Sequence, residues 1–149
     1  MTNSNDPFTP RPVILRPATL IARDRGGGAR TIPLVTRSVG ATGFINGITI
    51  FDPGAAVPLH CHNCEESILI LEGRAIAEID GVEYSVDTHD VTFLPANVPH
   101  RFRNASDLLP MRMLWTYASV AATRTIIATG DTRSIDSEHE PKPSIPSRC

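Results

Sequence analysis

The sequence lacks a strong charge of either sign. Its formal net charge is −2 over 149 residues, and the basic residues are scattered along the chain. Proteins that bind nucleic acid present clustered Lys and Arg, which form a basic surface toward the phosphates. We therefore expect no nucleic-acid partner.

Long apolar runs are also missing. No stretch approaches the length of a membrane span, and the N-terminus has no charged segment followed by an apolar core and a cleavage site. The sequence holds three cysteines, Cys61, Cys64 and Cys149, an odd number that suits a reducing compartment better than a disulfide framework. We expect a cytoplasmic protein without a membrane partner, in which Cys61 and Cys64 serve packing or are incidental.

A helical period is absent as well, whereas turn-forming residues are frequent. Thirteen prolines and ten glycines separate short segments rich in β-branched residues. This pattern predicts an all-β domain with antiparallel strands, arranged as a sandwich or barrel. The expected strands are 13–22, 31–38, 44–51, 57–62, 66–71, 75–79, 82–86, 91–94, 100–104, 111–120 and 123–129.

The chain length suits one domain, which we place at residues 13–130. Residues 1–12 are polar and proline-broken and are expected to form a mobile arm. Residues 24–30, with three consecutive glycines, are expected to form a flexible loop. Residues 131–149 are polar and rich in proline and serine, which predicts a disordered tail.

One stretch concentrates residues that bind metal ions. His60 and His62 are two positions apart, so in an extended strand both imidazoles point to one face. A turn over residues 63–65 then brings Glu66, at the start of an apolar run, opposite them. The neighbouring Glu65 faces away if Glu66 begins the strand, and Cys61 points to the opposite face from the histidines. His100 is the candidate fourth ligand.

These residues fall into two spaced motifs. The first is Gly54-x5-His60-x-His62-x3-Glu66-x6-Gly73, and the second is Pro95-x-Asn97-x2-His100-x3-Asn104. Both resemble the conserved motifs of the cupin family, in the same order. Two positions depart from the second motif, where Asn97 and His89 replace glycines. Asn tolerates positive φ well, so the turn before His100 should be retained.

The resemblance implies a double-stranded β-helix, or jelly-roll barrel, with a metal inside one end. The implied ligands are His60, His62, Glu66 and His100, which would hold one divalent transition metal. Nitrogen and oxygen donors do not select among Fe, Mn, Zn, Ni, Co and Cu. Cupins of this size commonly form homodimers, which we expect here too.

No second catalytic group stands out from the sequence. Tyr84 and Tyr117 are candidate acids, bases or hydrogen-bond donors, and Arg37, Arg74 and Arg112 are candidate binders of an anionic substrate. His139 lies in the polar tail and is not expected to be a ligand. Alternation places four side chains on one face of strand 111–120, as core, subunit contact or substrate cage: Met111, Met113, Trp115 and Tyr117.

The leading functional hypothesis is a metal-dependent enzyme acting on a small organic acid or polar metabolite. Dioxygenase, decarboxylase, isomerase and lyase activities all occur on this scaffold, so the fold does not select the reaction. The alternative is a cupin that binds or senses a small molecule without converting it. A third possibility is a metal-free barrel with vestigial histidines.

Overall fold

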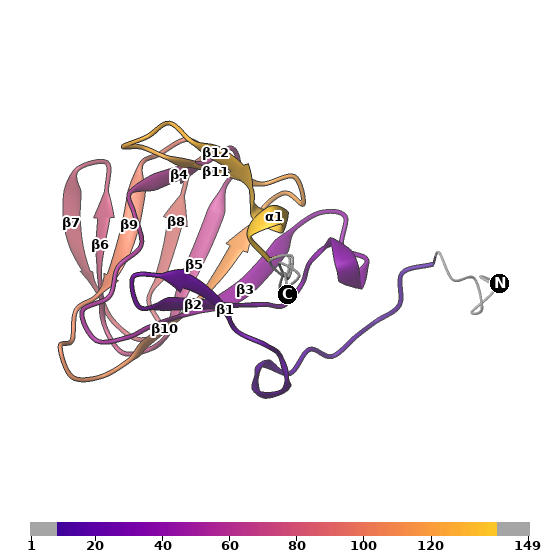
Figure 1. Ribbon diagram of the computed structural model, residues 1–149, viewed down its shortest axis with the longest axis horizontal. Helices are drawn as coiled ribbons and strands as arrows, with labels where there is room; N and C mark the ends of the chain where they lie inside the picture. The colour runs from indigo at the N-terminus through magenta and orange to yellow at the C-terminus, as the bar shows by residue number, and fades with distance from the viewer. Residues whose placement is uncertain (1–8, 140–149) are drawn as a thin grey trace, which may run out of the picture.

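The computed structural model describes residues 9–139. Twelve strands and three short helical segments follow one another along them, as Figure 1 shows. The first half contains η1 (Pro17–Thr19), β1 (Arg23–Gly26), β2 (Ala29–Pro33), η2 (Arg37–Val39), β3 (Ile45–Phe51), β4 (His60–His62) and β5 (Glu66–Glu72). The second half contains β6 (Ala75–Ile79), β7 (Val82–Val86), β8 (Val91–Leu94), β9 (His100–Asn104), β10 (Met111–Tyr117), β11 (Thr123–Ile126), β12 (Thr132–Ser134) and α1 (Ile135–His139).

The strands form two six-stranded antiparallel sheets. One sheet has the order β1-β2-β3-β10-β5-β8, and the other has the order β12-β11-β4-β9-β6-β7. Consecutive strands repeatedly cross from one sheet to the other, as β4 and β5 do. This arrangement is the all-β jelly-roll barrel that the sequence predicts. In Figure 1 the two sheets enclose the interior from opposite sides.

Alternation along the strands fills the space between the sheets. The residues at every second position of β10 are buried, and the residues between them are partly exposed. Phe51 and Phe102 are among the largest fully buried side chains, one from each sheet. Because neighbouring strand residues point to opposite faces, the inner face of each sheet supplies the core.

The tightest predicted hairpin is confirmed. Asp80 and Gly81 link β6 to β7 with φ of 49° and 83°, the double positive φ of a type I′ turn. The loop predicted over 24–30 is wrong, because these residues belong to the hairpin of β1 and β2. Gly27 and Gly28, with φ of 61° and 84°, form its turn. The glycine run is therefore part of a tight hairpin turn.

The strand predicted over 13–22 is also wrong. The segment contains only η1, where Pro17 occupies the first turn, a position that does not require an N–H donor. Val13, Ile14 and Ile21 are more than half exposed, so their apolar character does not reflect a place in the core. Residues 9–12 have no regular structure, and the rest of the predicted arm lies outside the described residues.

The barrel extends past residue 130, into the stretch that the sequence predicts as a polar tail. β12 pairs with β11, and α1 follows it with Ile135 only 1% exposed. One buried isoleucine and a backbone hydrogen bond from Ile135 N–H to Ala122 C=O hold this polar segment in place. Residues 140–149 of the predicted tail, including Cys149, lie outside the described part.

Among the described residues, no helix is long and apolar enough to cross a membrane. The cytoplasmic location and the homodimer stay predictions.

Candidate metal centre

The four predicted metal ligands meet inside the barrel, although they come from both sheets. His60 and His62 lie on β4, and His100 lies on the adjacent β9, directly across from His60 in the ladder. Glu66 begins β5 in the opposite sheet. The turn after His62 carries the chain from one sheet to the other. Residues only four positions apart, His62 and Glu66, therefore face the interior from opposite sheets. All four side chains are buried, at 2 to 5% exposure.

Each imidazole is held in one orientation by its Nδ1 atom. His60 Nδ1 lies 2.6 Å from the carbonyl oxygen of Pro58, His62 Nδ1 lies 2.9 Å from that of Thr123, and His100 Nδ1 lies 2.8 Å from that of Val98. A carbonyl oxygen only accepts, so Nδ1 carries the proton and donates it. The Nε2 lone pair of each neutral ring is then available to a metal ion.

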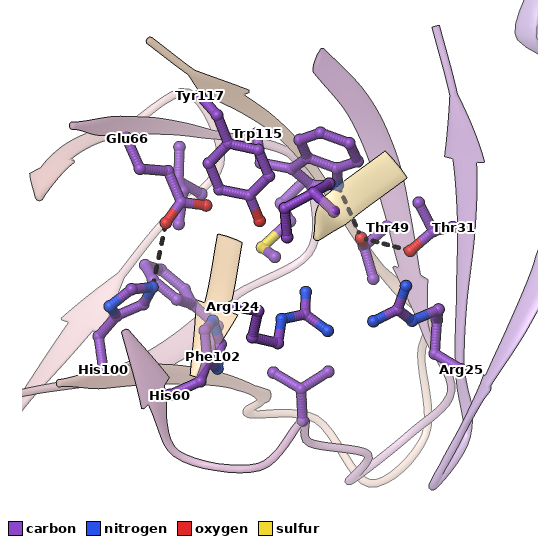
Figure 2. A pocket seen from close by; sticks show the side chains of 14 residues that line it. Arg25, Thr31, Thr49, His60, Glu66, His100, Phe102, Trp115, Tyr117 and Arg124 are labelled. Atoms are coloured by element: carbon purple, nitrogen blue, oxygen red, sulfur yellow. Dashed lines mark hydrogen bonds and ion pairs between the residues drawn. The ribbon is translucent and has the colours of Figure 1, made fainter. Parts of the chain in front are cut away.

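Three atoms at the centre carry lone pairs that could bind a cation, and they form no hydrogen bonds with one another. His62 Nε2, His100 Nε2 and Glu66 Oε2 are buried and make no hydrogen bond within the described structure. Glu66 Oε2 nevertheless lies 3.3 Å from His62 Nε2 and 3.0 Å from His100 Nε2, the latter contact drawn in Figure 2. With Nδ1 protonated, these contacts bring lone pairs together, which is unfavourable unless a cation lies between them.

The spacing of these atoms agrees with a common ion. Two ligand atoms about 2.1 Å from one metal, at an angle between about 90° and 109°, lie roughly 3.0 to 3.4 Å apart. The two contacts of Glu66 fall in that range. One nitrogen from each of His60, His62 and His100 also lies within 4.8 Å of the other two. Three imidazoles and one carboxylate therefore offer the ligand types that a divalent transition metal binds, and His62, His100 and Glu66 also have the spacing.

The protonation of the site suits metal binding. Burial, followed by the positive charge of Arg124 and of the other two histidines, lowers the pKa of His60 well below its usual value. Burial also lowers the pKa of His62 to about 4, although Glu66 opposes the shift. Near neutral pH both rings are therefore uncharged, the form that ligates metals.

The alternatives within the same stretch are placed elsewhere. Glu65 is exposed, whereas Glu66 faces inward, as strand parity predicts. Cys61 is less buried than the histidines on either side, and Cys61 and Cys64 are free cysteines. Asn97 has φ of 66°, the left-handed conformation that glycine adopts most easily and that asparagine tolerates. The turn before His100 is therefore retained. His89 has φ of 75° at the opposite end of β8 from that turn.

Most of the other predicted site residues lie away from the centre. Tyr84 is 52% exposed on β7. Arg37 and Arg74 are more than half exposed, in ion pairs with Asp136 and Asp87. Arg112 falls between the inward-facing residues of β10 and does not line the pocket. His139 ends α1, and its side chain lies outside the described part.

Tyr117 is the predicted catalytic candidate that the fold does bring to the site. It lies directly across from Glu66 in the ladder of β10 and β5, and its ring centroid is 4.4 Å from that of His62. Burial, and then the charge of Glu66, raise the pKa of Tyr117. Its hydroxyl therefore keeps its proton near neutral pH and acts as a hydrogen-bond donor.

Two arginines in the same pocket were not found from the sequence. Arg25 on β1 and Arg124 on β11 line it together with His60, Glu66, His100 and Tyr117. Figure 2 shows the two guanidinium groups facing each other, on the opposite side of the pocket from His100 and Glu66. Arg124 pairs with His62 across β11 and β4, so both side chains point inward. The cavity among these side chains measures about 30 Å³.

Met113, Trp115 and Phe102 form the apolar wall of the pocket. Trp115 is fixed by a hydrogen bond of 2.9 Å from its indole N–H to Thr49 Oγ1, which lies 3.1 Å from Thr31 Oγ1. The inward face of β10 therefore belongs to the core and also lines the site, whereas a subunit contact stays a prediction.

The comparisons with known proteins agree with this geometry. The model of the family described as "Cupin domain" matches residues 47–117, which include all four candidate ligands. The polyketide synthase CurC of Streptomyces cyaneus is 36% identical over 86 residues, which are 57% of this chain and 55% of CurC. The protein SchB of Streptomyces halstedii is 32% identical over 87 residues, which are 58% of this chain and 62% of SchB. The chain thus spans less than two thirds of the length of these relatives.

A solved structure supports the same fold. The polyketide cyclase RemF of Streptomyces resistomycificus superimposes with a TM-score of 0.68 at 20% identity, over 84% of this chain and 86% of RemF. At that identity the likeness concerns the fold alone. Together with two antiparallel sheets around a buried histidine cluster, these matches show that the chain contains a small cupin domain.

Proposed function

We propose that this protein is a metal-dependent enzyme that acts on a small organic substrate inside the barrel. The observation that carries the proposal is the convergence of buried, hydrogen-bond-free Nε2 and Oε2 atoms from His62, His100 and Glu66. Leaving such atoms without partners costs roughly 1 to 3 kcal/mol each, so a fold that retains them indicates a bound cation. His60, His62, Glu66 and His100 would hold this ion.

A divalent ion held by His60, His62, Glu66 and His100 would supply Lewis acidity to a carbonyl, enolic or carboxylate oxygen of the substrate. The chain contributes orientation, because the Nδ1 contacts fix the three rings before substrate binds. It also excludes water, since the apolar wall of Phe102, Met113 and Trp115 borders the ligands.

Tyr117 is the residue that we assign to proton handling. Its hydroxyl carries a proton near neutral pH because burial raises its pKa, and its ring packs on that of His62. It is therefore placed to donate a hydrogen bond to a substrate oxygen near the metal ligands. A negative charge that develops on this oxygen would be stabilised by the phenol.

The likenesses favour a substrate rich in carbonyl groups. CurC is named a polyketide synthase and RemF a polyketide cyclase. Polyketide intermediates carry carbonyl groups that enolise readily, and an enolising carbonyl is the group that a Lewis acid and a neutral phenol would activate together. We therefore propose an enolisable carbonyl compound as substrate, with isomerase, lyase or cyclisation chemistry ahead of dioxygenase or decarboxylase chemistry.

The alternative is a cupin that binds a small molecule without converting it. The observation that favours it is that Arg25 and Arg124 line the pocket, because guanidinium groups hold an anionic ligand but do not transfer protons. Both functions predict metal, so turnover separates them.

The test begins with elemental analysis of protein purified without added metal. The metal-loaded protein is then incubated with β-keto acids, β-diketones and phenolic compounds, and each is followed both by consumption and by the shift in Tm. Consumption that is lost in Tyr117→Phe, with metal content retained, supports the enzyme. A ligand that raises Tm without being consumed supports the binding protein. Absence of stoichiometric metal contradicts both.

A further inference from the structure

The pocket has a second polar end, formed by Arg25 and Arg124. Arg25 lies at the bulge of β1, where the register with β2 shifts between Asp24 and Gly26. Bulges redirect side chains, and here the guanidinium points into the pocket, as Figure 2 shows. Arg124 reaches the same space from β11, next to His62 in the ladder.

A single carboxylate lies between the two guanidinium groups. Glu138 Oε2 on α1 is 2.7 Å from Arg25 Nη2 and 3.2 Å from Arg124 Nη1. The side chains of Arg25, Arg124 and Glu138 are only 13, 17 and 13% exposed, so this is a mostly buried cluster with one excess positive charge. Glu66 is the next carboxylate, and it contacts the histidines.

Arg124 also hydrogen-bonds to the Tyr117 side chain, yet it retains unused hydrogen-bonding capacity. Arg124 Nε is buried and has no hydrogen-bond partner within the described residues. A guanidinium carries five N–H donors and normally binds a carboxylate through two of them, yet only one oxygen of Glu138 makes these contacts. A buried guanidinium N–H without a partner is unfavourable until an acceptor such as a carboxylate binds it.

The cavity is too small for an organic acid while Glu138 is in place. Its volume of about 30 Å³ admits one or two water molecules. The segment that carries Glu138 follows β12 and is held by buried Ile135, by the backbone hydrogen bond from Ile135 N–H to Ala122 C=O, and by ion pairs, which include the exposed pair of Arg37 with Asp136. The exposed pair contributes little, and an incoming carboxylate could replace the buried pairs of Glu138 one for one, so the short helix α1 is the part of the wall that we expect to move.

From these observations we propose that Arg25 and Arg124 form a carboxylate-binding subsite, which Glu138 occupies in the absence of ligand. The proposal rests on the proposed function and narrows its substrate to a carbonyl compound that also bears a carboxylate. The substrate carboxylate would replace that of Glu138 between the two guanidinium groups, and its carbonyl would then lie toward Tyr117 and the histidines.

The test uses acetoacetate and its methyl ester, which differ in the carboxylate, and measures binding to the full chain by titration calorimetry. Arg25→Gln and Arg124→Gln should each reduce the preference for the acid over the ester roughly tenfold. Glu138→Gln should strengthen acetoacetate binding roughly tenfold, because the internal competitor loses its charge. A merely structural ion pair would instead weaken binding in all three variants.

Matched controls come from the outer face of β9 and β6. Arg101 and Glu78 form an exposed ion pair there, so Arg101→Gln and Glu78→Gln repeat the two charge changes away from the pocket. Both should leave the preference unchanged. If an arginine variant does not fold, Glu138→Gln still tests the subsite. The subsite is overturned if this variant does not bind acetoacetate more tightly than the wild type.

Metal content, measured on every variant, separates this proposal from the proposed function. If the protein binds metal and the variants of Arg25, Arg124 and Glu138 keep the wild-type preference for the acid, the subsite alone is overturned. The same holds if the preference disappears with the metal and not with the arginines, because the carboxylate then binds the ion. A metal-free protein that prefers the acid through both arginines supports the subsite and overturns the proposed function alone.

Discussion

The buried histidines make the stability of the metal-free protein depend on pH. His62 has a folded pKa of about 4, against about 6.5 in an unfolded chain. The unfolded state therefore binds this proton more readily, and the free energy of unfolding falls as pH falls through the window from 6.5 to 4. Above 6.5 the full stability is present.

The magnitude follows from the two pKa values. For one group with this shift, linkage gives a loss of roughly 2.5 kcal/mol between pH 7 and pH 4.5. His60, whose pKa is also lowered, adds to the loss with the same sign. The perturbation that isolates His62 is His62→Gln, which retains an amide for the contact with the Thr123 carbonyl but does not titrate.

Urea unfolding of the chelator-treated protein at pH 7 and pH 4.5 measures this effect. We expect His62→Gln to lose less stability over this interval than the wild type, by roughly 2.5 kcal/mol. A substitution of exposed His89 is the control and should leave the interval unchanged. Equal losses in the wild type and His62→Gln would refute the assignment of a neutral, buried His62.

Three further predictions concern the ligands and the loops around them. His60→Ala should reduce metal content, measured by elemental analysis, far more than Glu65→Ala; equal metal content in the two variants would contradict the ligand assignment. Cys61→Ser should leave metal content nearly unchanged, and a large loss would contradict the strand parity of β4. Asn104→Asp should lower the free energy of unfolding by about 3 kcal/mol, because a carboxylate would face three carbonyl oxygens that the Asn104 amide now binds. Unfolding in urea measures this, and a loss below about 1 kcal/mol would argue that the hydrogen bonds from Asn104 to the Phe51, Asp52 and Leu109 carbonyls contribute little.

The convergence of the candidate ligands could be predicted because their geometry is mostly local. His60 and His62 share a face by strand alternation, and a short turn returns the chain to Glu66. His100 lies farther along the sequence, and only the family motif connects it to the others. Strand boundaries in the middle of the chain were predictable for the same reason, since turn residues such as Asp80 and Gly81 fix them.

The arginines of the pocket could not be found by this reasoning. Arg25 lies beside a glycine run that was interpreted as a loop, and its direction depends on a bulge. Arg124 faces inward because β11 pairs with β4, which is about sixty residues earlier in the chain. Glu138 follows a polar stretch whose place in the fold depends on one buried side chain, Ile135. Long-range pairing, which local patterns do not encode, brings these three residues together.

The central claim is that four side chains from both sheets bind one cation. Anomalous diffraction from crystals of protein purified without added metal, recorded at the absorption edges of the first-row metals, tests this directly. We expect one peak per chain, within about 2.0 to 2.3 Å of the Nε2 atoms of His60, His62 and His100 and of a carboxylate oxygen of Glu66. A fully ordered site without a peak, or a peak bound elsewhere on the chain, would contradict the claim.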